Sequence, residues 1–247
     1  MRRFHIRADA VSGECVSFDA AEAHHLARVL RLGPGDMVQA VDGRGLELTV
    51  RLTRVGPRGA EGAIVGRVSR PVESPLDLTL AQGIPKGDKL ESIIRMATEL
   101  GVARIVPLVT ERTIARAEPS RWGQRLLRCQ RVAREAAKQS GRAIVPEVKG
   151  PRALTDWLGE PRPPGLLLCC WEGERTGLAA ALPAGGLERA TVVVGPEGGL
   201  SEGEVTRLRS AGAVVAGLGP RILRTETAGP VALALLQARY GDLGATR

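Results

Sequence analysis

Apolar and polar positions follow two patterns along this chain, and the second half shows the clearer one. From residue 76 onward, continuous apolar runs of strand length alternate with segments whose apolar residues recur at helical spacing. The runs predict strands at 76–84, 104–110, 165–172, 190–196 and 213–219, and the segments predict helices at 87–101, 121–139, 175–182, 201–211 and 227–240. This alternation is typical of an α/β fold with a parallel sheet covered on both faces. Ligands of such sheets bind at the carboxyl ends of the strands.

The N-terminal part has a shorter period, with short alternating runs separated by glycine-containing turns. The runs DMVQAVDG (36–43), LELTVRLTRVG (46–56) and GAIVGRVSR (62–70) predict strands. One helix is expected at 19–30, where Asp19 is a good N-cap and Glu22 completes a capping-box pattern. This part of the chain is interpreted as a small β-barrel.

A change of pattern at SRPVESP, residues 69–75, marks a domain boundary because two prolines stand there among polar residues. The 247 residues then divide into a small domain at 1–72 and a larger one at 73–247. That length is enough to bury a substantial core.

The charge balance points to a polyanionic partner. The net charge is +8, and lysine occurs only at four positions, so arginine supplies most of the positive charge. Nucleic acid is the most plausible partner of so basic a chain, although a GC-rich genome would also enrich arginine. Only six aromatic residues are present, which argues against a base-stacking platform.

Several classes of protein and site are not expected. The chain shows neither an apolar run of membrane-spanning length nor the apolar region of a signal peptide, so a cytoplasmic protein without membrane contact is predicted. The spacing of the four cysteines and three histidines predicts neither a metal site nor a disulfide. Cys169 and Cys170 lie in an apparent buried strand, which favours structural thiols.

The stretch GPEGG, residues 195–199, follows a predicted buried strand, where glycines let the backbone approach a ligand closely. Glu197 suits a ligand with hydroxyls, amines or positive charge. The alternative interpretation of GPEGG is a plain turn between a strand and a helix.

The overlapping GLSEG (199–203) matches the nucleophile-elbow pattern, but every histidine lies upstream, whereas that pattern needs one after the serine. We therefore interpret Ser201 as a helix N-cap that forms a capping box with Glu204.

The stretch LGPRILRTETA, residues 218–228, is the second candidate loop. Its Ile-Leu pair is expected to line an apolar slot, and its arginines suit a phosphate. Thr225 or Thr227 is a candidate cap for the following helix. Two such loops at neighbouring strand ends predict a pocket.

Basic residues gather on the predicted helices 87–101 and 121–139. They fit either a solvated surface or contact with an RNA backbone.

With these features in view, the sequence resembles the RsmE family, the 16S rRNA (uracil-N3) methyltransferases of the SPOUT superfamily. Four stretches carry the resemblance: KGDKLESIIRMATELGVARIVPLVTER, EAAKQSGR, VVVGPEGGLSEGE and LGPRILRTETA. The segment HHLARVLRLGPGD is also similar to the PUA-like domain of that family. The resemblance spans nearly the whole chain.

The resemblance implies a PUA-like barrel followed by a SPOUT domain with a deep trefoil knot. It also implies S-adenosylmethionine as cofactor, a homodimer, and uracil 1498 of 16S rRNA, within the 30S subunit, as substrate. The implied cofactor-binding residues are Gly195, Pro196, Glu197, Gly198, Gly199, Leu218, Gly219, Ile222, Leu223 and Arg224.

For catalysis, Arg224 is expected to stabilise negative charge on the uracil. Glu226 is expected either to position or accept a proton, or to have a structural role. The candidate RNA contacts are Lys86, Lys89, Arg112, Arg128, Arg131 and Arg142.

Two other functions remain open from the sequence. One is a SPOUT enzyme that modifies another rRNA or tRNA base. The other is a non-catalytic RNA-binding or assembly factor with the same fold. One departure from the family pattern is Gly229-Pro230 after TETA, and we expect the loop to survive it because proline is tolerated in a first helical turn.

Overall fold

The computed structural model describes residues 1–244 except 8, 57, 69–71 and 115–118, and side chains of the helical residues 119–121 are also not described. The chain forms two compact units. The first contains Met1–Glu73 together with Ala137–Val145, and the second contains Ser74–Ala136 together with Pro146–Arg247. The first three residues of the expected boundary segment 69–75 lie outside the described residues.

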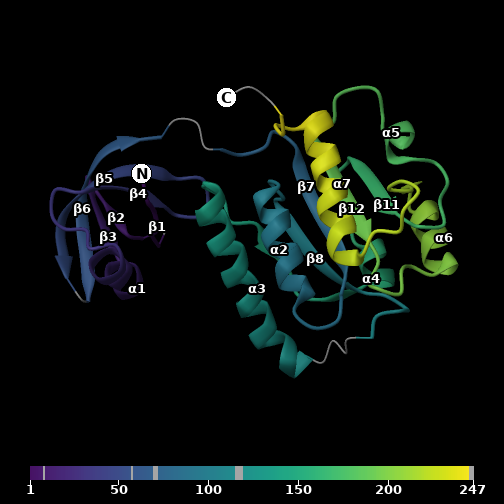
Figure 1. The fold of residues 1–247 in the computed structure, drawn as a ribbon, viewed down its shortest axis with the longest axis horizontal. Helices are drawn as coiled ribbons and strands as arrows, with labels where there is room; N and C mark the ends of the chain where they lie inside the picture. The colour runs from purple at the N-terminus through teal and green to yellow at the C-terminus, as the bar shows by residue number, and fades with distance from the viewer. Residues whose placement is uncertain (8, 57, 69–71, 115–118, 245–247) are drawn as a thin grey trace. The chain divides into compact units, whose positions relative to one another are not determined.

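The first unit is built on a six-stranded, barrel-type sheet (Figure 1). Its strands are β1 (Arg3–His5), β2 (Val11–Ser12), β3 (Cys15–Phe18), β4 (Met37–Val41), β5 (Glu47–Gly56) and β6 (Gly59–Arg67). They pair in the order β1-β4-β5-β6-β3-β2, with β1 and β4 parallel and the other pairs antiparallel. The three strands expected from the sequence are confirmed as β4, β5 and β6, whereas the short strands β1 to β3 were not predicted.

The single predicted helix of this unit is confirmed in a modified form. It comprises α1 (Ala20–His24) and a π-helical turn over His25–Val29. The Asp19 carboxylate caps α1 by accepting a hydrogen bond from the backbone N–H of Glu22. The reciprocal half of the expected capping box is wrong, because the Glu22 carboxylate accepts hydrogen bonds from the His5 backbone N–H and the Lys138 ammonium.

An apolar core closes this unit, with Phe4 and Phe18 in edge-to-face contact at 6.1 Å between ring centroids. The return segment 137–145 joins the unit through polar contacts. Arg142 is paired with Glu73 at 2.8 Å, and Lys138 with Glu22 at 3.0 Å.

The second unit contains a seven-stranded sheet whose strand pairs are all parallel (Figure 1). Its strands are β7 (Asp77–Gly83), β8 (Arg104–Val109), β9 (Glu147–Val148), β10 (Arg152–Ala153), β11 (Leu166–Cys170), β12 (Arg189–Val194) and β13 (Val214–Ala216). The order is β10-β8-β7-β12-β11-β13, with β9 also paired to β8. The parallel α/β sheet predicted from the alternating pattern is therefore confirmed. The deep knot stays a prediction, because strand order alone does not define one.

Helices cover both faces of this sheet, as the pattern predicts. The helices from residue 74 onward are α2 (Lys89–Glu99), α3 (Pro119–Ser140), α4 (Leu154–Gly159), α5 (Leu178–Ala181), α6 (Glu202–Ser210) and α7 (Thr225–Tyr240). Helices α2 and α7 pack together on one face, where α7 contacts β7 and β12. On the other face, Leu154 and Trp157 of α4 and Val205 of α6 pack in one core with alternate residues of the strands.

Two helix predictions need correction. Only four residues of the expected helix 175–182 are helical, because the Glu174 carboxylate accepts the backbone N–H groups of Arg175 and Thr176 and folds the chain into a turn. Helix α7 begins at Thr225 rather than at residue 227, so Pro230 lies beyond its first turn. The helix nevertheless continues through Pro230 to Tyr240.

Gly83, the last residue of β7, lies where the carboxyl edge of the sheet is tightly packed, and a substitution there tests this packing. A Cβ atom at this position would lie 2.5 Å from the backbone nitrogen of Pro196, which leaves no room for a side chain. We expect Gly83→Ala to lower the free energy of unfolding by about 1–3 kcal/mol, measured by chemical denaturation. Gly150→Ala is the matched control, because nothing lies within 4 Å of its added Cβ. Equal stability of the two variants would contradict the predicted close approach.

Candidate functional site

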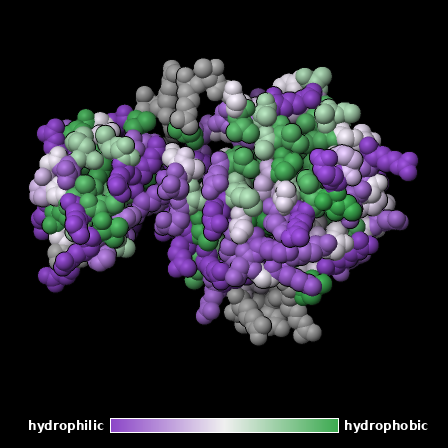
Figure 2. Space-filling view, viewed as in Figure 1, coloured by the Kyte–Doolittle hydropathy of each residue, from purple (hydrophilic) through white to green (hydrophobic). Residues whose placement is uncertain are grey.

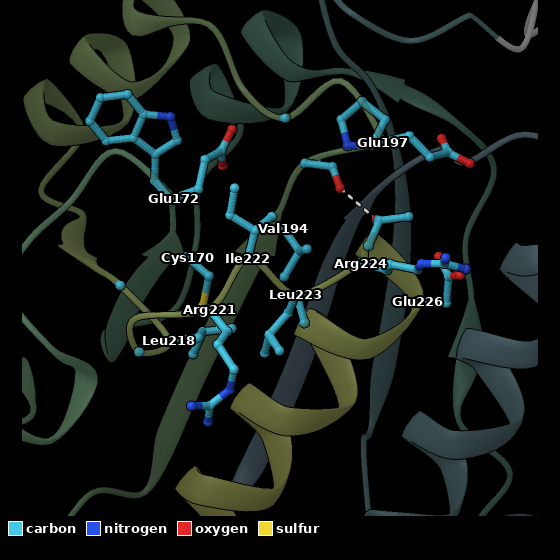
Figure 3. A pocket seen from close by; sticks show the side chains of 18 of the residues that line it. Cys170, Glu172, Val194, Glu197, Leu218, Arg221, Ile222, Leu223, Arg224 and Glu226 are labelled. Carbon is cyan, nitrogen blue, oxygen red and sulfur yellow. Dashed lines mark hydrogen bonds between the residues drawn. The ribbon is translucent and has the colours of Figure 1, made fainter.

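A pocket of about 390 Å³ lies at the carboxyl edge of the second unit's sheet (Figure 3). Four strands that are neighbours in the sheet, β7, β12, β11 and β13, end at this edge. Most of the lining comes from three segments that follow β11, β12 and β13. The two loops predicted from the sequence therefore do form one pocket.

Glycine is required in the GPEGG loop for two separate reasons. A Cβ at Gly195 would lie 2.8 Å from the carbonyl carbon of Gly199, so the loop folds back on itself too closely for a side chain. Gly199 has a φ of +70°, which side chains rarely tolerate, and its N–H donates to the Pro196 carbonyl at 2.9 Å. The loop is a compact turn with its backbone facing the pocket.

A buried hydrogen-bond network connects this turn to the start of α7. The Thr225 hydroxyl donates to the Gly195 carbonyl at 2.7 Å. The Gln82 side-chain amide, at the end of β7, donates to the Thr225 hydroxyl at 2.9 Å and to the Gly195 carbonyl at 3.3 Å. The prediction that Thr225 or Thr227 caps α7 is wrong, because Arg224 occupies the N-cap position without a side-chain bond. Thr225 instead joins the two loops of the pocket.

The capping-box interpretation of Ser201 is confirmed. Its hydroxyl accepts the Glu204 N–H at 3.1 Å, and the Glu204 carboxylate accepts the Ser201 N–H at 2.9 Å. Glu204 is also bonded to the Glu111 N–H at 2.8 Å, which ties α6 to the segment after β8. Ser201 thus has a structural role at the start of α6.

The lining combines an apolar wall with a charged rim. Cys170, Val194, Leu218 and Leu223 form the wall, and Figure 3 shows them grouped in the centre of the view. Ile222 also borders the pocket, but its side chain is 86% exposed. It is therefore available to contact a bound molecule from the solvent side.

At the rim, one ammonium group lies between two carboxylates. Lys89 Nζ is 2.9 Å from Glu197 Oε1 and 3.6 Å from Glu226 Oε2. The hydrogen bond to Glu197 raises the pKa of Lys89. Burial opposes ionisation of Glu197, but hydrogen bonds from Lys89 and from the Lys86 backbone N–H outweigh it and lower the pKa of this carboxyl. Both groups are charged at neutral pH.

The pocket lining contains nine of the ten expected cofactor-binding residues and both expected catalytic residues. The remaining one, Gly198, is not part of the lining, and its carbonyl accepts a hydrogen bond from Arg112 at 2.8 Å.

The candidate RNA contacts have different environments. Lys86 and Arg131 are exposed, whereas Lys89 lines the pocket. Arg128 is half-exposed and paired with Asp88 at 3.2 Å. The prediction for Arg142 is wrong, because its side chain is only 4% exposed and donates two hydrogen bonds to the Glu73 carboxylate.

The end of β11 and the residues after it were not predicted as part of the site, yet Cys170, Trp171 and Glu172 line the pocket. The sequence did contain a signal for them. The apolar run 165–172 was predicted as a strand of the parallel sheet, and its carboxyl end should therefore lie at the same edge as the two loops. The cysteines of β11 are protonated thiols at neutral pH, because burial raises the pKa of Cys169 to about 12 and also raises that of Cys170.

The described residues contain no group of three or more His, Cys, Asp or Glu side chains suited to bind a metal ion. No helix in the same part of the chain is long and apolar enough to cross a membrane.

Comparison with known proteins connects this architecture to a family. The model of an RNA methyltransferase domain matches residues 72–237, and that of an RNA methyltransferase PUA domain matches 18–65. The ribosomal RNA small subunit methyltransferase E of Bacillus subtilis is 34% identical over 89% of this chain and 88% of its own length. The Synechocystis protein of the same name is 38% identical over 90% of this chain and 73% of its own.

A solved structure shows the same relationship. The crystal structure of a ribosomal RNA small subunit methyltransferase E from Neisseria gonorrhoeae, bound to S-adenosyl methionine, superposes with a TM-score of 0.87. It is 34% identical and covers 98% of this chain and 99% of its own.

Replacing Thr225 by valine tests the connection between the loops. The substitution keeps the shape of the side chain and leaves the Gly195 carbonyl without its shortest hydrogen bond. We expect a loss of about 1–3 kcal/mol in the free energy of unfolding. Thr206→Val, on the exposed face of α6, should cost much less. Equal losses in denaturation experiments would show that the network adds nothing specific to stability.

Proposed function

The chain belongs to the ribosomal RNA small subunit methyltransferase E family, and from this membership we propose that it methylates N3 of a uracil in 16S rRNA with S-adenosylmethionine as methyl donor. The observation that carries the proposal is the single pocket formed by GPEGG and LGPRILRTETA at the carboxyl edge of the sheet. Uracil 1498, the base implied by the resemblance, is the proposed target.

The pocket suits the proposed cofactor in size and chemistry. Its volume of about 390 Å³ lies within the range of small-molecule sites. The apolar wall suits an adenine ring, and the backbone of Gly195 and Gly199 also lines the pocket. Glu172 and Glu197 supply carboxylates for hydroxyl or ammonium groups. When bound, the cofactor would supply an activated methyl group on a sulfonium sulfur.

The residues of the second loop suit the uracil side of the reaction. The N3–H of uracil is a weak acid, so methylation requires a proton acceptor or stabilisation of the developing negative charge. Arg224 is an exposed cation at the pocket, in position to interact with uracil oxygens. Glu226, the second residue of α7, also lines the pocket and presents a carboxylate for the proton.

The RNA itself would be recognised through basic residues around this pocket. Lys86, Arg112 and Arg131 are exposed on the second unit, and the +8 net charge favours a polyanion. The implied substrate form is the 30S subunit, which would place the enzyme in the cytoplasm.

A homodimer is also proposed, and the outer face of α7 supports it. Val231 and Leu235 lie one turn apart on this helix, and Leu235 is 46% exposed. Green and white residues cover α7 in Figure 2, whereas purple residues cover α3. An apolar helix face of this kind suits burial against a second copy of the chain.

We expect Arg224 to contribute to the rate of methyl transfer but little to the stability of the fold. We expect Arg224→Ala to reduce the rate of methyl transfer to 30S subunits by about 10²–10³-fold, because one charge-stabilising donor is lost. The melting temperature should not change, since this side chain is exposed. Arg152→Ala, on the exposed part of β10, controls for the loss of one positive charge.

Three outcomes would contradict the proposal. Absence of S-adenosylmethionine binding in a calorimetric titration would favour a non-catalytic RNA-binding or assembly factor. Transfer of the methyl group to another base, or to tRNA, would favour a different SPOUT activity. Full activity of the Arg224 variant would remove this residue from the reaction.

The dimer is tested separately by Leu235→Asp. A charge at this position should convert a dimer into a monomer in sedimentation experiments, because it would be buried without a partner. Leu127→Asp, on a 67% exposed position of α3, should leave the mass unchanged. A wild-type protein that sediments as a monomer would refute the proposed dimer.

A further inference from the structure

Lys89 lies where the two loops of the pocket meet, although it belongs to neither. It is the first residue of α2, and its ammonium reaches Glu197 of the GPEGG turn and Glu226 of α7. We call these three residues the Lys89 cluster. One positive charge is thus shared between two negative charges from separate segments.

The two carboxylates depend on Lys89 to different degrees. Glu197 also accepts hydrogen bonds from the backbone N–H of Lys86, at 3.1 Å and 3.3 Å to its two oxygens. Glu226 Oε2 is buried and accepts no hydrogen bond in the described part of the chain. Among these residues, Lys89 at 3.6 Å is the only side chain paired with it. Removing the Lys89 ammonium would therefore leave Glu197 bonded but Glu226 without an ion-pair partner.

A buried carboxylate oxygen without a donor is energetically costly, and a nearby ammonium offsets part of that cost. We propose that Lys89 is a positioning residue that holds the Glu226 carboxylate at the pocket, so that Glu226 accepts the proton from uracil N3. This inference rests on the proposed function.

In the proposed step, the N3–H proton moves to the Glu226 carboxylate. The electron pair of the N3–H bond then forms the new bond from N3 to the methyl carbon. The carbon–sulfur bond breaks, and its electron pair stays on sulfur as a neutral thioether.

The other charged groups near Glu226 do not replace Lys89. Glu197 lies across the same ammonium and is negative, while Arg224 on the preceding loop is exposed to solvent. Arg221 and Glu172 also line the pocket, but neither is paired with Glu226 in the described residues. Lys89 itself is a poor proton acceptor, because its pKa is raised and the neutral amine is scarce at neutral pH.

The experiment compares Lys89→Met with Lys89→Arg in the full-length protein. Single-turnover methylation of 30S subunits is followed with labelled S-adenosylmethionine. We expect Lys89→Met to lower the single-turnover rate about tenfold or more, because Glu226 loses the ammonium that positions it. Lys89→Arg should restore most of the rate. Lys149→Met removes a similarly exposed lysine elsewhere and should leave the rate unchanged.

A double-mutant cycle separates positioning from simple structural damage. If Lys89 acts through Glu226, the double variant Lys89→Met with Glu226→Gln should be no slower than Glu226→Gln alone, within about threefold. Additive losses, or a Lys89→Met variant as fast as the wild-type protein, would overturn the inference. A matching loss of melting temperature in Lys89→Met and Lys89→Arg would also overturn it.

If the proposed methyltransferase function is wrong, the experiments give a different result from the one that refutes the role of Lys89. In that case the wild-type protein itself would bind no S-adenosylmethionine or would methylate no uracil. An active wild-type enzyme with additive variants would refute the role of Lys89 alone.

Discussion

The pocket depends on one small set of hydrogen bonds, in which Gln82 and Thr225 share the carbonyl of Gly195. All three groups are buried, so none of them has water as an alternative partner. Because an unsatisfied buried polar group costs more than a typical hydrogen bond contributes, the network favours one arrangement of three chain segments. The end of β7, the turn after β12 and the start of α7 are thereby kept in register. Glycines at 83 and 195 then allow backbones to approach where side chains would collide.

Much of the fold follows from the sequence pattern. The continuous apolar runs predicted five of the seven strands of the parallel sheet, because strands buried on both faces need apolar residues throughout. The short strands β1 to β3, β9 and β10 escaped prediction, since two to four residues carry too little periodicity to recognise. Helix 175–182 was overpredicted because the carboxylate of Glu174 competes for the backbone N–H groups that would begin it.

The residues of the pocket could also be predicted only in part, because the order of elements places some of them and not others. Residues that act through their position after a strand, such as Gly195 and Leu218, could be assigned from the order of elements. Thr225 and Lys89 could not, because their partners lie 30 and 108 residues away in the sequence. Arg142 shows the converse difficulty, since a cation in a basic stretch proved to be a buried partner of Glu73.

The position of β12 in the sheet has a consequence for how the chain is made. This strand lies between β7 and β11, yet it follows both in the sequence. Until it pairs with β7, whose residues precede it by 112 positions, two long apolar edges have no neighbour. Contacts between such distant segments form slowly, and unpaired edges favour association with other chains. The pocket is thus completed only after most of the polypeptide has been synthesised, and an interrupted translation product would lack the site entirely.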